Sequence, residues 1–180
     1  MEKPLITMDH KARLLALLAA IFAAAAMRLV PHPPNFSPIA AMALVSGAYL
    51  PRRALSFAAP FGALLLSDAV LGFYPGVGFV YASFALTILI GWMLSSRKTP
   101  LRIGAAAVAS SVLFFIVTNF GMWMFSGFYP RTAEGFIACY VAAIPFFQNT
   151  LAGDLVFAGI LFGLLSLLPK ADRGGLAARA

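Results

Sequence analysis

Charged residues are scarce in this chain of 180 residues, and acidic residues are the scarcest. Asp and Glu together number 6, against 13 for Lys and Arg, and the four types make up 11% of the sequence. A soluble domain of this size carries about 25% charged residues. Because the hydrophobic share is 62%, the composition excludes an ordinary soluble domain and predicts an integral membrane protein.

Cysteine and histidine are also nearly absent, which excludes several kinds of site. The single cysteine, Cys139, cannot form a disulfide within the chain or a CxxC metal or redox motif. The histidines, His10 and His32, fall on opposite sides of the expected topology, so they cannot clamp one haem. The sequence also lacks a nucleotide-binding loop. We expect no cofactor, no metal site and no catalytic residue, and a protein that is not an enzyme.

Long apolar runs occupy most of the sequence. A hydrocarbon core of about 30 Å takes roughly 20 helical residues to cross, and six runs fit this frame with little left over. We therefore expect an all-α membrane protein, a bundle of six transmembrane helices in a single transmembrane domain over residues 1–180, with a flexible cytoplasmic tail at 169–180. The expected helices are residues 14–30, 38–50, 54–73, 77–94, 103–120 and 136–168, the last with a break near residue 148.

The basic residues lie mostly on one side of this bundle. With the N-terminus placed inside, eleven of the thirteen Lys and Arg residues fall in inner segments, and Arg28 and Arg131 fall outside. This bias predicts a multi-pass protein of the cell membrane, the inner membrane of a bacterium, with both termini cytoplasmic. It also accounts for the net charge of +7, so we expect no nucleic-acid partner.

The first apolar run allows three interpretations. Lys11 and Arg13 before an apolar core and small residues also describe a cleavable signal peptide. Against cleavage, alanines recur at spacings of four, a pattern that lets helices approach closely and favours a helix-docking face. These alanines are Ala16, Ala20 and Ala24, and also Ala19 and Ala23. Alanine packing inside the bundle is the third interpretation.

The second apolar run is too short to cross a bilayer, because its thirteen residues cover only about 20 Å. The preceding segment, VPHPPNFSPI at residues 30–39, contains four prolines that forbid a continuous helix. We expect it to dip inward as a re-entrant outer loop. Since non-helical backbone is tolerated at membrane depth only where protein buries it or it lines an aqueous cavity, we expect a cavity open to the outside.

Polar and aromatic residues gather at the depth of that loop. Asp68 and Asp154 both fall about 8 to 9 Å below the outer boundary, counted at 1.5 Å per helical residue. Intramembrane acids are functional candidates, although either one could instead form a structural ion pair with Arg28. We expect one pocket for a small, flat or amphiphilic solute. Its expected residues are Asn35, Asp68, Asn119, Trp123, Tyr140, Asn149 and Asp154.

Four blocks of the sequence carry a resemblance to a known family: RLVPHPPNFSPIAAMAL, LLLSDAVLGFYP, TNFGMWMFSGFYPRTAEGF and CYVAAIPFFQNTLAGDL. Over residues 28–168 they resemble the signature blocks of an uncharacterised bacterial family of small membrane proteins, a domain of unknown function. In its six-helix layout and alanine-patterned first helix, the chain also resembles the substrate-binding S components of energy-coupling-factor transporters, which capture vitamins.

This second resemblance implies transport, with capture of a small vitamin-like or heterocyclic solute from the outer side. It also implies an energy-coupling module as a partner, a transmembrane coupling subunit plus ATPases, docked at Ala16, Ala20 and Ala24. Two alternatives stay open. One is a structural or assembly membrane protein without a ligand. The other is an intramembrane aspartyl protease with Asp68 and Asp154 as its pair, although LAGD at residues 151–154 lacks the first glycine of the GxGD element.

Overall fold

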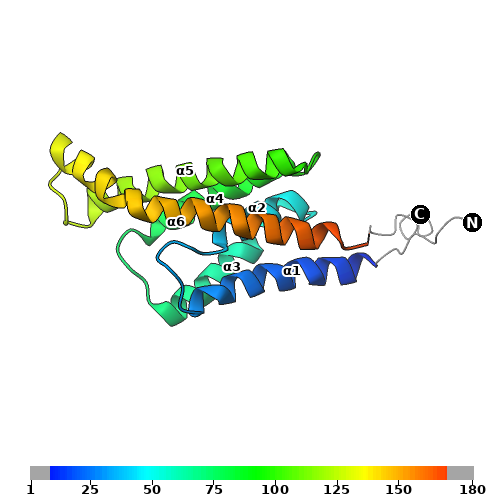
Figure 1. The fold of residues 1–180 in the computed structure, drawn as a ribbon. Coiled ribbons are helices and arrows are strands. Elements are labelled where there is room, and N and C mark those ends of the chain that lie inside the picture. The colour runs from blue at the N-terminus through cyan, green and yellow to red at the C-terminus, as the bar shows by residue number, and fades with distance from the viewer. Residues whose placement is uncertain (1–8, 170–180) are drawn as a thin grey trace, which may run out of the picture.

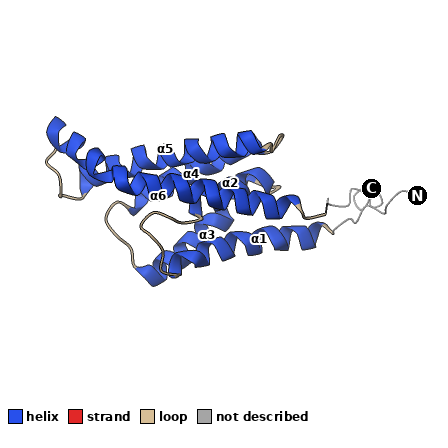
Figure 2. Cartoon of the chain, viewed as in Figure 1, coloured by secondary structure: helices blue, strands red, loops and turns tan. Residues whose placement is uncertain are grey.

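The computed structural model describes residues 9–169, and within that range every regular element is a helix (Figures 1 and 2). Five helices are long and apolar enough to cross a membrane, and a sixth is shorter. They are α1 (His10–Ala26), continued by the 3-10 helix η1 (Met27–Leu29), α2 (Ile39–Tyr49), α3 (Arg53–Leu71), α4 (Val77–Leu94), α5 (Pro100–Phe125) and α6 (Ala133–Ser166). The expected all-helical membrane protein with six helices is confirmed. Of the tail expected at 169–180, residues 170–180 lie outside the described residues.

The short helix α2 forms the centre of the bundle. Ten of its 11 residues are buried, from Ile39 to Ala48. It packs most extensively against α4 and also contacts α6, α1 and α3. A helix that is apolar all round must be surrounded by protein or lipid, and here the neighbouring helices surround it. Figure 1 shows α2 beside α6, in the half of the bundle where α1 begins and α6 ends.

Helices α5 and α6 form a hairpin that extends beyond the other helices at the left of Figure 1. Both helices start earlier than the apolar runs suggested, because each has an N-terminal cap. The Thr99 hydroxyl accepts from the Arg102 amide at 3.4 Å, and the Thr132 hydroxyl accepts from the Gly135 amide at 3.2 Å. With 34 residues, α6 is about 51 Å long, which exceeds a hydrocarbon core of about 30 Å.

Helix α6 differs from the expectation of a break near residue 148. It runs without interruption from Ala133 to Ser166, with Pro145 inside. The polar residues of this region are satisfied without unwinding the helix. Thr150 donates to the Phe146 carbonyl at 3.0 Å, and Asn149 donates to the Pro34 carbonyl at 3.0 Å. The proline therefore removes one backbone hydrogen bond but does not end the helix.

The alanines of α1 fall on two faces of the helix. Ala24 is buried in the bundle, Ala16 and Ala20 are half-buried, and Ala19 and Ala23 are exposed. Because residues four apart share a face of a helix, the stripe of Ala16, Ala20 and Ala24 turns inward, whereas Ala19 and Ala23 lie on the outer surface.

Two glycines allow α2 and α4 to touch through their backbones. A Cβ atom at Gly47 would overlap the carbonyl oxygen of Ile88, and one at Gly91 would overlap the carbonyl oxygen of Leu44. The Ser46 hydroxyl, next to Gly47, donates to the Ser56 carbonyl at 2.6 Å and holds the end of α2 against α3. Small residues at helix interfaces permit this close packing in membranes.

We predict that Gly47→Ala destabilises the protein by about 1 to 3 kcal/mol, because the added methyl must push the α2 and α4 backbones apart. Gly159→Ala is the matched control, since a Cβ there meets nothing within 4 Å, and alanine is the better helix former. Unfolding in detergent, followed by circular dichroism, measures both. Equal stability of the two variants would contradict the close contact.

Candidate functional site

A cavity of about 750 Å³ lies where a longer α2 would have continued. Helices α4 and α6 each pack against α2, but they make no substantial contact with each other within residues 9–169. On the N-terminal side of α2, the space between α4 and α6 is therefore left open. Its volume falls within the 300 to 1,000 Å³ typical of small-molecule sites.

Aromatic and small apolar side chains make up most of the cavity wall. The lining residues are Asn35, Tyr74, Pro75 and Gly76 from two loops, Val80 from α4, Phe114, Phe115, Thr118, Asn119 and Met122 from α5, Phe128 and Tyr129 from the loop after α5, and Cys139, Ala142, Ala143, Phe146, Phe147 and Thr150 from α6. None of these described lining residues is charged. Such a lining suits a flat or amphiphilic solute that makes a few hydrogen bonds.

The loop at residues 30–38 reaches the large cavity at Asn35 and is fixed to the middle of α6; we call it the floor loop. Its Phe36 ring packs against Phe157 with ring centroids 5.4 Å apart, and the Pro34 carbonyl accepts from Asn149. Asn35 has a φ of 62°, a left-handed conformation that asparagine tolerates better than most residues. Gly153 makes room for the loop, because a Cβ there would lie 3.3 Å from the Phe36 backbone.

Among the polar side chains of the wall, Asn119 and Tyr74 offer hydrogen-bonding groups to a ligand. The Asn119 amide donates to the Phe115 carbonyl at 2.7 Å, while its side-chain oxygen accepts no hydrogen bond from the described residues. Tyr74 lies in the turn between α3 and α4. Burial raises the pKa of its hydroxyl above the ordinary value of 10.0, nearby Asp68 raises it further, and Arg28 lowers it. The Tyr74 hydroxyl therefore remains protonated at neutral pH and can donate.

Trp123 and Tyr140 lie behind the cavity wall. The indole nitrogen of Trp123 donates to the Pro130 carbonyl at 3.0 Å, and the Tyr140 hydroxyl donates to the Ile116 carbonyl at 2.7 Å. Both rings pack against Phe136, with centroids 5.2 and 4.5 Å apart. Their hydrogen-bonding groups are thus already used, and the two residues brace α5 against α6.

Asp154 lies beneath the floor of the cavity and is 3% exposed. One of its carboxylate oxygens accepts from the Ser111 hydroxyl at 2.6 Å. Asp154 lines a second, much smaller cavity of about 20 Å³ with Asn35, Ser37, Ala40, Phe84, Phe114 and Thr150. Ser111 is a partner that the sequence did not single out, because one serine in an apolar helix gives little signal of its role.

Asp68 lies apart from both cavities, in a cluster of polar side chains between η1, α3 and α4. Its oxygen Oδ1 is 2.6 Å from Nη1 of Arg28, and Oδ2 accepts from the Tyr81 hydroxyl at 2.7 Å. Arg28 also donates to the Ser67 hydroxyl at 2.6 Å. Apart from the ion pair, Oδ1 of Asp68 accepts no hydrogen bond from the described residues. Asp68 is 1% exposed, so this pair holds two buried charges together.

The expected site residues thus occupy five different settings. Asn35 and Asn119 line the large cavity, and Asn35 also borders the small one with Asp154. Asn149 holds the floor loop, Trp123 and Tyr140 brace the wall, and Asp68 pairs with Arg28. Of the two acids, Asp68 therefore adopts the ion pair that the sequence left open as an alternative.

We predict that Asp68→Asn and Arg28→Met each destabilise the protein by about 3 to 5 kcal/mol, because each leaves a buried charge without its partner. The double variant should lose much less than the sum of the two single losses. Unfolding of the four proteins in detergent measures this coupling. Additive losses would show that the pair does not hold η1 against α3.

Comparison with known proteins identifies a family for the chain. The family model described as "Family of unknown function (DUF6580)" matches residues 8–174. No curated protein and no solved structure matches the chain. The match covers nearly the whole sequence, including every helix and both cavities described above. This helical membrane protein therefore belongs to the family of unknown function DUF6580.

Proposed function

We propose that the protein is a membrane transport protein, an S-component-like subunit that captures a small vitamin-like or heterocyclic solute from the outer side. The observation that carries this proposal is the cavity of about 750 Å³ at one end of the bundle. Its aromatic walls would cover a flat ring, and Asn119, Asn35 and Tyr74 would orient it by hydrogen bonds.

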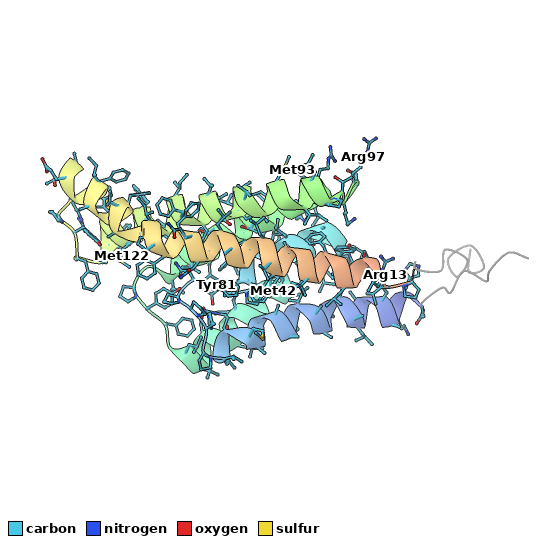
Figure 3. All side chains as sticks on the ribbon, viewed as in Figure 1. Arg13, Met42, Tyr81, Met93, Arg97 and Met122 are labelled. Atoms are coloured by element: carbon cyan, nitrogen blue, oxygen red, sulfur yellow. The ribbon has the colours of Figure 1, made fainter. Side chains whose placement is uncertain are left out.

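The distribution of charge supports an outward-facing cavity. Arg13 and Arg97 lie at one end of the bundle, and Met122, which lines the cavity, lies toward the other (Figure 3). Further basic residues lie in the adjoining loops and first turns. Lys98 and Arg102 lie near Arg97, and Arg52 and Arg53 lie at the start of α3. Since basic loops stay cytoplasmic, the cavity faces outward and α1 begins on the inner side.

The depth of the floor loop supports a re-entrant segment. Thr150, at the cavity, lies 16 residues before Ser166, the end of α6, which is about 24 Å along the helix. Phe157, against which the loop packs, lies about 13 Å from the same end. Both depths are within a hydrocarbon core of about 30 Å. The loop and α2 together would complete the sixth crossing.

Energy for transport would come from partner subunits, because the sequence has no nucleotide-binding loop. The outer face of α1 is the proposed docking surface. On it, Ala19 and Ala23 are exposed, with Ala16 and Ala20 at its border, while Ala24 packs inside the bundle. Small exposed residues let a partner helix approach closely.

Two alternatives compete with solute capture. An aspartyl protease needs two carboxylates that share a proton, but Asp68 hydrogen-bonds Tyr81 and Asp154 hydrogen-bonds Ser111. No hydrogen bond joins the two acids within residues 9–169, which favours binding over hydrolysis. A structural protein without a ligand would leave the cavity unused, and the following experiment separates that case from ours.

We predict that the purified protein retains a small molecule that native mass spectrometry identifies, and that Ala142→Trp abolishes its retention. Ala142 lines the cavity and is exposed, so the larger side chain fills the binding space without disturbing the core. Asn119→Ala should weaken binding roughly 5- to 150-fold, the effect of losing one buried hydrogen-bond partner.

The matched control is Ala105→Trp, which places the same side chain at an exposed position of α5 outside the cavity lining. It should leave retention unchanged. If no molecule is retained, or if both tryptophan variants behave alike, the protein does not use this cavity and the structural alternative stands.

We predict that a cysteine at position 128 reacts with a membrane-impermeant maleimide in whole cells, whereas one at position 97 does not. Phe128 is 80% exposed in the loop after α5, and Arg97 lies in the basic loop between α4 and α5. Both cysteines are placed in a Cys139→Ala background. Labelling at 97 but not at 128 would reverse the orientation and the direction of capture.

A further inference from the structure

Asp154 is a buried carboxylate without a cation. Among residues 9–169, the ion pair found is that of Arg28 with Asp68, and no basic side chain lies within 4 Å of Asp154. Its oxygen Oδ2 accepts from Ser111, whereas Oδ1 accepts no hydrogen bond from the described residues and is not fully enclosed. One oxygen is therefore free to bind a donor.

The small cavity beside Asp154 is a space for such a donor. Its volume of about 20 Å³ holds roughly one water molecule or a group of that size. It shares Asn35, Phe114 and Thr150 with the large cavity, so it lies directly next to the floor of the large one. A ligand in the large cavity can thus extend a compact head group toward Asp154.

The groups around the small cavity match a primary ammonium. Asp154 offers a carboxylate oxygen, and Thr150, whose hydroxyl already donates to the Phe146 carbonyl, offers a lone pair. Asn35 borders the same space, and its side-chain amide supplies an oxygen of the same acceptor type. An ammonium group has three N–H donors and no acceptor, and it is about the size of a water molecule.

The charge of the site also favours a cationic head group. An unpaired carboxylate is costly inside a membrane protein unless it takes up a proton or a cation compensates it. The large cavity has no charged lining residue, so within the described part of the site the ligand is the available source of that cation. Hydrogen bonds between an ammonium and a carboxylate are about twice as strong as neutral ones.

We propose that the site takes an arylalkylamine, a primary alkylamine that carries an aromatic ring. The ring would lie between the aromatic walls of the large cavity, and the ammonium would lie in the small cavity facing Asp154. This inference rests on the proposed function, since it names the class of solute that the same cavity captures. A neutral alcohol would fit the same space but would leave the charge uncompensated, and a quaternary ammonium would be too large for it.

Three related probes test the assignment on the full chain in detergent: tryptamine, its alcohol analogue tryptophol, and N,N,N-trimethyltryptammonium. Binding is measured by the rise in unfolding temperature over a range of probe concentrations. We expect tryptamine to bind at least tenfold more tightly than either analogue. Asp154→Asn should weaken tryptamine at least tenfold and change tryptophol less than about threefold, because the ring contacts remain.

Glu134→Gln is the matched control, because Glu134 is an exposed acid in the first turn of the same helix and its loss should change no affinity. If Asp154→Asn does not fold, the relative affinities of the wild-type protein for the three probes decide the case. Equal affinity for tryptamine and tryptophol, or no binding of tryptamine, overturns the amine assignment. Retention of a different solute that Ala142→Trp abolishes would then leave the proposed function intact.

Discussion

The length of α2 is the constraint on which the rest of the structure depends. Its 11 residues fill the centre of the bundle over about half of a bilayer's thickness. Helices α4 and α6 pack on it and not substantially on each other, so the bundle is closed where α2 is present and open where it is missing. The proline-rich loop then covers the exposed end of α2, and the cavity occupies the space that remains.

The two buried acids show how differently such a bundle can treat a charge. The charge of Asp68 is compensated within the protein by Arg28, and Asp68 also accepts a hydrogen bond from Tyr81. These contacts join η1, α3 and α4 at a point apart from both cavities. Within residues 9–169, the hydrogen-bond partner of the Asp154 carboxylate is the Ser111 hydroxyl, and Asp154 lies beside the small cavity. A charge that is compensated within the protein stabilises the fold, whereas an uncompensated charge can still interact with a ligand.

The sequence predicted the six helices well, because they follow from the lengths of the apolar runs along one dimension. The short run before Leu50 and the four prolines ahead of it indicated a missing part of the bundle. The site residues were harder, because depth does not fix the direction in which a side chain points. The sequence predicts similar depths for Asp68 and Asp154, yet one contacts Arg28 and the other Ser111. These tertiary partners, and the unbroken course of α6 through Pro145, have no local signal in the sequence.

The hairpin of α5 and α6 that extends beyond the other helices would affect how fast an amphiphilic molecule reaches the cavity. About 20 Å of α6 lies beyond a hydrocarbon core of about 30 Å, and its neighbourhood displays apolar side chains such as Phe128 and Ile137, 80% and 61% exposed. In the orientation proposed above, this part of the molecule would lie at the level of the lipid headgroups and above. An amphiphilic molecule that partitions into that layer diffuses in two dimensions rather than three. In the proposed orientation, such a molecule would meet the hairpin within that layer, and it would reach the mouth of the cavity by diffusion along the membrane as well as from the surrounding water.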